Sequence, residues 1–137
     1  MLVNVSLKFH EHIASVVHKA SGLSHNFMKS TVCRSRDFML VLLKTHVRPV
    51  LEYASCLWCT GYIDDMRRLE SVQRRWTKQM EDLEKLTYLE RLKELNLLSV
   101  QGRLLRADLI EYWKFVHGNS SISPGDMFAQ PFRQGTR

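Results

Sequence analysis

The chain has 137 residues, a length at which one domain can bury a hydrophobic core without disulfide or metal cross-links. Its hydrophobic and charged fractions, 45% and 25%, are those of a globular protein and exclude an intrinsically disordered one. The net charge of +6 favours a polyanionic partner, with nucleic acid the first candidate. A basic surface that only keeps the protein soluble fits this charge equally well.

Cysteine usage and hydropathy indicate the compartment. The three cysteines are an odd number, and residues 1–7 lack the apolar core of a signal peptide. The longest apolar run, residues 38–43, is too short to span a bilayer. We therefore expect a soluble intracellular chain with reduced thiols and no membrane partner, in either the nucleus or the cytoplasm.

Apolar spacing predicts an all-α fold, a bundle of about five helices over residues 1–118. Residues 119–137 are rich in Ser, Gly, Pro and Gln without periodicity, which predicts an irregular, disordered tail. In the first helix, residues 8–29, Gly22 is expected to interrupt the helical path. The apolar stripe of this helix comprises Phe9, Ile13, Val16, Val17 and Ala20.

The second helical region contains a proline. Residues 38–43 are apolar on nearly all sides and are expected to be central to the core. Pro49 either kinks this helix or lies in the first turn of a new one, where its missing N–H costs nothing. Gly61 is expected to end the region. The apolar face after the proline comprises Val50, Tyr53, Ala54, Leu57 and Trp58.

Three further helices follow, each with a start signal. Asp64 is expected to cap the next helix, with Asp65 favourable in its first turn and a buried stripe of Leu69, Val72, Trp76 and Met80. Thr87 and Glu90 form a capping box that opens a short helix over residues 88–95. Ser99 caps the last helix, which ends at Gly118. Its predicted buried stripe is Leu105, Leu109, Tyr112, Trp113 and Val116.

Residues 62–65 have the Y-x-D-D form of a reverse-transcriptase active site. Two-metal nucleotidyl transfer requires clustered carboxylates, which in such enzymes lie in a turn between two strands. Here an amphipathic helix follows, and helix capping explains Asp64 and Asp65 without catalysis. We therefore predict no catalytic residue in this chain and interpret the match as a coincidence.

Cysteine and histidine pairs suggest metal sites that the spacing does not support. Cys56 and Cys59 form a C-x-x-C pair, but no second ligand pair completes a zinc site, and buried core thiols are the favoured interpretation. His10 and His12 lie near His18, but His10 lacks the partner four residues on that a helical zinc site requires. We therefore predict no metal ligand and no cofactor in this chain.

Basic residues recur at helical spacing in two helices. They predict two flanks around the stripe of the helix after Asp64, and a row along the last helix. Such rows neutralise backbone phosphates without reading sequence, although a solvated face partly paired with Glu70, Asp82, Glu84 and Glu111 fits as well. The candidate nucleic-acid-binding residues are Arg67, Arg68, Arg74, Arg75, Lys78, Arg103 and Arg106.

Five segments in order carry a family resemblance. They are L-x-W-x-x-H-I at residues 7–13, with Phe9 in place of tryptophan; V-R-P-x-L-E-Y-A-S-x-x-W at 47–58; L-E-x-V-Q-R-R at 69–75; Y-x-E-R-L-x-x-L at 88–95; and R-R-L-R-x-D-L at 102–109, from which Gly102 and Leu105 depart. Together they resemble the region after the catalytic palm in reverse transcriptases of non-LTR retrotransposons (LINE elements), especially the jockey-like and chicken-repeat-like groups.

This resemblance implies a function for the chain. It would be the thumb of an RNA-directed DNA polymerase, which grips an RNA–DNA hybrid or other nucleic acid and is inactive without the fingers and the Mg²⁺-binding palm. Arg74, Arg75, Arg103 and Arg106 match family positions and are the preferred contacts. The absent palm and fingers are implied partners, and an apolar face without them implies self-association. The alternative is a host-adopted helical protein-interaction module without polymerase function.

Overall fold

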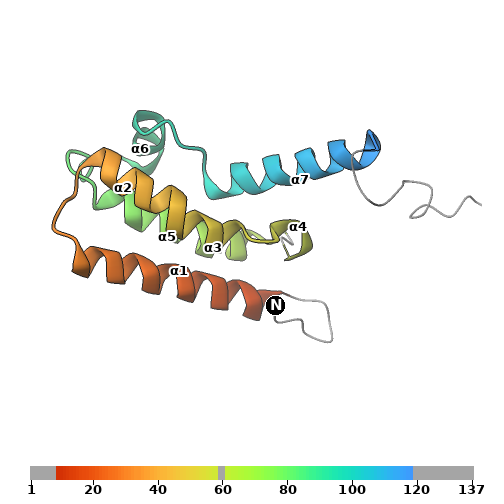
Figure 1. Cartoon of the computed structure of the whole chain (residues 1–137), viewed down its shortest axis with the longest axis horizontal. Coiled ribbons are helices and arrows are strands. Elements are labelled where there is room, and N and C mark those ends of the chain that lie inside the picture. Colours follow the sequence, from red (N-terminus) through yellow and green to blue (C-terminus); the bar gives the residue numbers. More distant parts are fainter. Residues whose placement is uncertain (1–8, 59–60, 119–137) are drawn as a thin grey trace, which may run out of the picture.

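A computed structural model of the chain describes residues 9–58 and 61–118 (Figure 1). Every regular element in these two ranges is helical, so the all-α prediction is confirmed for them. The helices are α1 (His10–Ser30), α2 (Arg36–Leu42), the π-helical η1 (Leu43–Val47), α3 (Arg48–Glu52), α4 (Ser55–Trp58), α5 (Ile63–Lys78), α6 (Tyr88–Glu94) and α7 (Val100–Val116). The predicted disordered tail, residues 119–137, lies outside the described residues.

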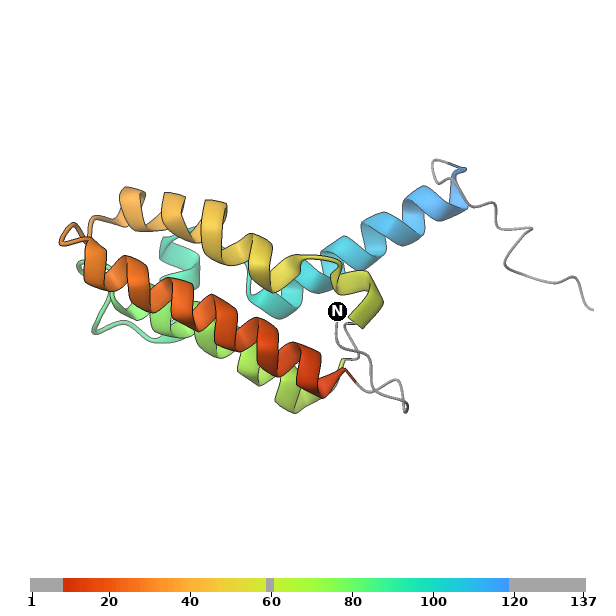
Figure 2. The ribbon, with the colours of Figure 1, turned by 60° about the horizontal axis from the view of Figure 1, so that its bottom comes forward.

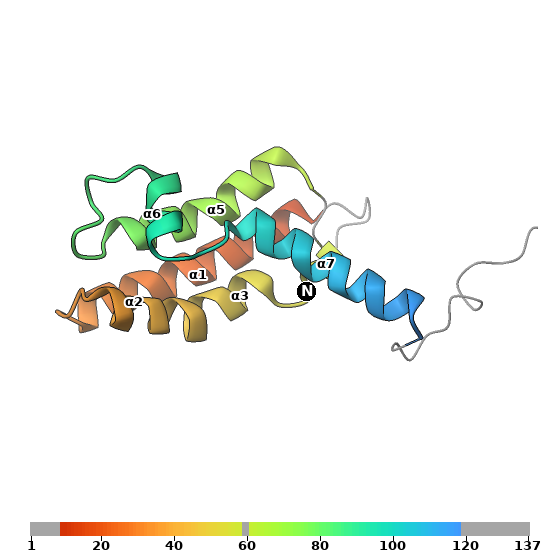
Figure 3. The same ribbon diagram turned by 90° about the horizontal axis from the view of Figure 1, so that it is seen from above.

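Three long rods form the centre of the bundle. Helices α2, η1 and α3 follow one another as a single rod, which packs beside α1, and α1 packs along α5 (Figure 2). Helix α6 and the start of α7 pack on α5. Counting the rod as one helix, the described residues contain five helices and the short turn α4, as predicted. The second half of α7 extends beyond the rest of the bundle (Figure 3).

Helix α1 does not break at Gly22, so that prediction is wrong. The helix continues to Ser30, with Ile13, Val16 and Ala20 buried on one side. A glycine in a helix costs about 1 kcal/mol relative to alanine. Packing on both sides of Gly22, including Phe27 edge-to-face against Trp76 at 6.4 Å, keeps the helix continuous.

The proline is accommodated without a break in the rod. Pro49 lies in the first turn of α3, directly after the π-helical η1, at a position where the N–H that proline lacks costs little. The expectation that residues 38–43 are central to the core holds only for one side of the rod: Met39 and Leu43 are buried, whereas Phe38 and Val41 are exposed. The side chains that this rod buries are Met39, Leu43, Val47 and Leu51.

After the rod, the predicted apolar face is only partly buried. Trp58 is buried and its indole N–H donates to the carbonyl of Tyr53 at 2.8 Å. Tyr53 and Leu57 are exposed, contrary to expectation, because Ala54 adopts a left-handed φ of 53° that turns the chain between α3 and α4. Helix α4 ends at Trp58, residues 59–60 lie outside the described residues, and Gly61 has a positive φ of 73°.

Helix α5 buries Leu69, Val72 and Trp76 of the predicted stripe, and Met80, which follows the helix end, is buried as well. The predicted cap is wrong by two residues, since the helix begins at Ile63 with Tyr62 at the N-cap position. Asp64 and Asp65 therefore both lie in the first turn, where the helix dipole stabilises their negative charges.

Helix α6 begins at the predicted capping box. The backbone N–H of Thr87 donates to the Glu90 carboxylate at 2.7 Å, and the N–H of Glu90 donates to the Thr87 hydroxyl at 3.4 Å. The hydroxyl of Thr87, and then its backbone N–H, lower the pKa of Glu90. The prediction that Ser99 caps α7 is also confirmed. Its hydroxyl accepts a hydrogen bond from the backbone N–H of Gly102 at 3.0 Å.

Replacing Thr87 by alanine is expected to lower the free energy of unfolding by about 1 kcal/mol. The hydroxyl, which accepts from the N–H of Glu90 and donates to its carboxylate, is lost, whereas the backbone N–H of residue 87 can still donate to that carboxylate. Since the pKa of Glu90 is lowered in the folded state, its contribution is present above the unfolded pKa and is lost as the pH falls through the folded one. The difference between the two proteins should therefore shrink in acid. Urea unfolding at neutral and acid pH measures it, with Thr45→Ala, an exposed mid-helix threonine, as the control.

Helix α7 buries a different side from the one predicted. Its buried residues are Val100, Arg103 and Leu104, all in the first two turns. The predicted stripe of Leu105, Leu109, Tyr112, Trp113 and Val116 is exposed, with exposed fractions from 50% to 67%. The apolar pattern is real, but this side of the helix faces away from the bundle. Gly118, with φ 69°, follows the helix end as predicted.

Candidate nucleic-acid interface

The exposed side of α5 is basic from Arg67 to Lys78. At 100° per residue, the buried positions of this helix fall on one side and its five basic residues fall within an arc of about 120° on the other. They are Arg67, Arg68, Arg74, Arg75 and Lys78, and we call them the α5 basic face. The two predicted flanks are therefore one continuous surface.

The α5 basic face is almost free of internal ion pairs. Arg67 lies 3.4 Å from Asp64, but both side chains are strongly exposed, so this pair contributes little. The other four cations form no ion pair with the described residues. Glu70, an expected partner, instead accepts from the Tyr88 hydroxyl and from the backbone N–H of Gln101 at 3.2 Å. The cationic groups are thus available to a polyanion.

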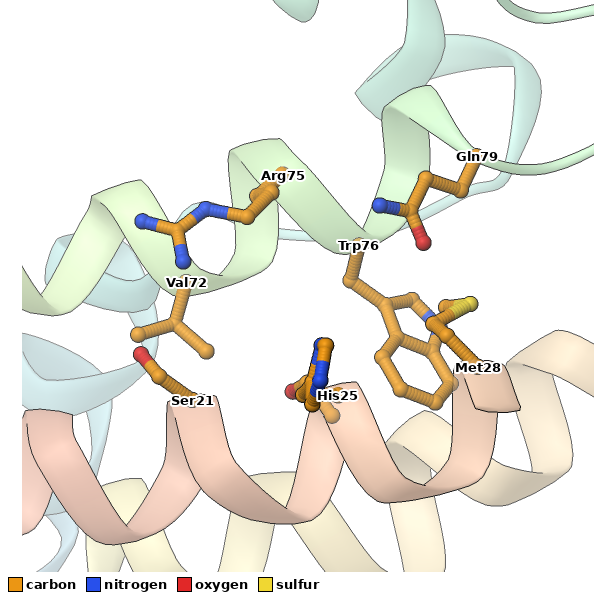
Figure 4. A pocket seen from close by; sticks show the side chains of 8 residues that line it. Ser21, His25, Met28, Val72, Arg75, Trp76 and Gln79 are labelled. Atoms are coloured by element: carbon orange, nitrogen blue, oxygen red, sulfur yellow. The ribbon is translucent and has the colours of Figure 1, made fainter. Parts of the chain in front are cut away.

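A groove between α1 and α5 borders this face (Figure 4). Arg75 of α5 and Gln79, directly after this helix, lie on one side of it, and Ser21 and His25 of α1 lie on the other. The enclosed volume is about 90 Å³, with Trp76 and Met28 at its apolar end. Ser21 and His25 were not predicted, because nothing in their local sequence shows that α1 places them opposite Arg75.

Arg74 is held on the other border of the face. Its guanidinium lies 5.0 Å from the centroid of the Tyr88 ring, which is a cation–π contact. Burial, and then the hydrogen bond to Glu70, raise the pKa of Tyr88, so its hydroxyl keeps its proton. Arg74 and Arg67 line a hollow together with Gln101 at the start of α7. The face therefore presents one arginine that is already oriented.

Arg103 does not belong to this surface. Its side chain is only 7% exposed, its Nε donates to Glu52 at 2.5 Å and its Nη1 donates to the side-chain carbonyl of Gln73 at 2.8 Å. Burial lowers the pKa of this guanidinium. The predicted phosphate contact at Arg103 is corrected to an interior position, because its guanidinium is buried and already engaged by Glu52 and Gln73.

Arg106 is exposed, but on the far side of α7 from the α5 basic face. It lines a separate groove with Lys44 and Arg48 of the central rod. The seven predicted contacts are thus divided by the structure into five residues on one face, one in the interior and one in a second groove.

Several residues of the family-like segments hydrogen-bond to one another. Gln73 donates to the hydroxyl of Tyr88 at 3.1 Å and to the carbonyl of Leu98 at 3.0 Å. With the bonds of Glu52, Glu70 and Arg103, these contacts join α3, α5, α6 and α7 in one polar network. The segments that carry the resemblance therefore build the interior contacts between helices.

The Y-x-D-D residues do not form a metal site. Asp65 is buried and its Oδ2 lies 2.5 Å from Nδ1 of His10, whereas Asp64 is exposed and faces Arg67. Within residues 9–58 and 61–118, no group of three or more His, Cys, Asp or Glu side chains is placed to hold a metal ion. The arrangement therefore does not fit the two-metal chemistry of a polymerase palm.

The remaining cysteine and histidine candidates lie apart. Cys56 is exposed, so its predicted core position is wrong, and Cys59 lies outside the described residues. His12 contacts the Trp58 ring at 5.6 Å, and His18 is exposed. Among the described helices, none is long and apolar enough to cross a membrane.

Comparisons of the chain with protein-family models, with curated proteins and with solved structures find no match.

Proposed function

We propose that this chain binds the sugar–phosphate backbone of nucleic acid through the α5 basic face, as the thumb element of a non-LTR retrotransposon reverse transcriptase. The observation that carries the proposal is the grouping of five cations on one side of a single helix, four of them without an ion pair among the described residues. A carboxylate is present there only at Asp64, at the beginning of the helix. Such a surface attracts phosphates and positions a duplex without reading its bases.

The geometry favours a backbone over a small ligand. Helix α5 has 16 residues and is therefore about 24 Å long, and its basic residues span most of that length. Phosphates of a nucleic acid recur along such a distance, whereas a small anion would engage one or two cations. In this proposal the chain holds the nucleic acid and carries out no chemistry, and the Mg²⁺-dependent step belongs to the palm of the polymerase.

Replacing Arg74 and Arg75 together by alanine is expected to weaken binding to an RNA–DNA hybrid by about tenfold or more. It should also reduce the slope of log K against log salt by about 2, because two phosphate contacts are lost. Fluorescence anisotropy of a labelled hybrid at several salt concentrations measures both quantities. Circular dichroism checks that the variant retains its helices.

The matched control removes two exposed cations from other helices, Lys19 of α1 and Lys93 of α6, as a double alanine variant. Net charge falls equally, so long-range attraction changes equally in both variants. Equal affinity and equal salt slope in the two variants would reject the α5 basic face as the interface.

A second function, a host-adopted protein-interaction module, is favoured by another observation. The exposed stripe of α7, Leu105 to Val116, is an apolar helix face of the kind that docks on a protein groove. A defined protein partner without salt-dependent nucleic-acid binding would select this function. In the thumb proposal the same stripe contacts the palm or fingers of the polymerase or a second copy of the chain.

A further inference from the structure

A second basic groove lies between the central rod and α7, separate from the α5 basic face. Lys44, Arg48 and Arg106 line it together with the buried Arg103. Among the described residues, Glu52 is the only carboxylate in its lining. Four cations therefore share one anion, so the lining carries an excess of three positive charges.

The single carboxylate is already used by two arginines. Oε1 of Glu52 lies 2.5 Å from Nε of Arg103 and 3.3 Å from Nε of Arg48. Lys44 and Arg106 form no ion pair within the described parts of the chain. A buried cation requires full compensation by charge and hydrogen bonds.

Arg103 is incompletely compensated. Its Nη2 is buried and has no hydrogen-bond partner among the described residues. Burial lowers the pKa of Arg103, and the neighbouring Arg48 opposes the effect of Glu52 by lowering it further. Additional negative charge in the groove would stabilise both guanidinium groups.

The other wall of the groove is apolar. Leu97, Leu98, Ala107 and Ile110 line it, and Asn96 adds an amide at its edge. The groove has a volume of about 620 Å³, which lies within the range of small-molecule sites. It has room for an organic group beside an anion.

We propose that this groove binds the phosphate of a nucleotide, with Lys44, Arg48 and Arg106 around the phosphate and the nucleoside against Leu98 and Ile110. Guanidinium groups match phosphate oxygens in pairs, which favours phosphate over a carboxylate of equal charge. The site is independent of the α5 basic face, because the first turns of α7 lie between them. A free mononucleotide and one nucleotide of a single strand present the same chemistry.

Titration of the full ¹⁵N-labelled chain with AMP, followed by amide chemical shifts, tests the site. We expect shifts around residues 44–52, 96–98 and 103–110 and a dissociation constant of about 1 mM or below. The variant Lys44→Gln/Arg106→Gln, which leaves the Glu52–Arg103 pair intact, should bind AMP at least about tenfold more weakly. Lys19→Gln/Lys93→Gln, with the same charge change, should bind like the unaltered chain.

Two results would overturn the proposal: no shift in these segments, or equal affinity in the two glutamine variants. Arg74→Ala/Arg75→Ala should leave AMP binding unchanged. If this variant lost AMP binding, the phosphate would be assigned to the α5 basic face and the groove would be rejected. A short single-stranded oligonucleotide identifies the source. Tighter binding than AMP at the same amides indicates a strand, and equal binding indicates a mononucleotide.

Discussion

Replacing Glu52 by alanine is expected to lower the free energy of unfolding by about 3 kcal/mol, although its side chain is near the surface. The physical reason is Arg103. Its guanidinium is buried and would lose the carboxylate that compensates its charge, while Nη1 would remain bound to Gln73. Equilibrium urea unfolding, followed by far-ultraviolet circular dichroism, measures the change.

A double-mutant cycle separates the charge from the packing. Arg103→Met retains an apolar stem but removes the cation, so Glu52→Ala/Arg103→Met should be more stable than Glu52→Ala alone, by about 1 kcal/mol or more. Glu94→Ala is the control, because its ion pair with Arg36 is exposed and should contribute about 0.5 kcal/mol. If the changes in the free energy of unfolding caused by Glu52→Ala and by Arg103→Met simply added in the double variant, Arg103 would be solvated when Glu52 is absent.

Local signals in the sequence predicted local structure well. Thr87 with Glu90, and Ser99, each act on backbone groups within three residues, so neither depends on the rest of the fold. The buried residues of the α5 stripe, Leu69, Val72 and Trp76, were predicted correctly because this helix is packed from several sides. The regular geometry of the helix also defines the α5 basic face. At 100° per residue, the basic residues of the two predicted flanks fall on one continuous surface.

Positions decided by distant contacts were not predictable in the same way. Arg103 has the spacing of a surface arginine, and its burial depends on Glu52, 51 residues earlier in the chain. The stripe of α7 shows the converse. Periodicity identifies which side of a helix is apolar, but not which neighbour covers it, and here the buried side is the one with Arg103.

The residues of the family-like segments lie mostly in the interior, whereas the residues of the proposed interface lie on the surface. The family-like segments place Glu70, Gln73 and Tyr88 in one interior network, which explains why these residue types occur together. Only Arg74 and Arg75 belong both to a family-like segment and to the α5 basic face. They connect the predicted framework with the proposed interface, which is why the binding experiment removes that pair.

Replacing Trp76 by alanine is expected to lower the free energy of unfolding by about 3–5 kcal/mol, because the indole fills the contact between α5, α1 and the central rod. Its side chain is 1% exposed and its Nε1–H donates to the carbonyl of Met39 at 3.1 Å. Trp113→Ala removes the same side chain from α7, where it is 53% exposed, and should cost about 0.5 kcal/mol or less. Urea unfolding at several protein concentrations compares them. If both variants lost the same free energy of unfolding, and the loss depended on protein concentration, the α7 stripe would be covered in solution by a second copy of the chain. A free-energy loss for Trp76→Ala well below the expected range would contradict this packing of the core.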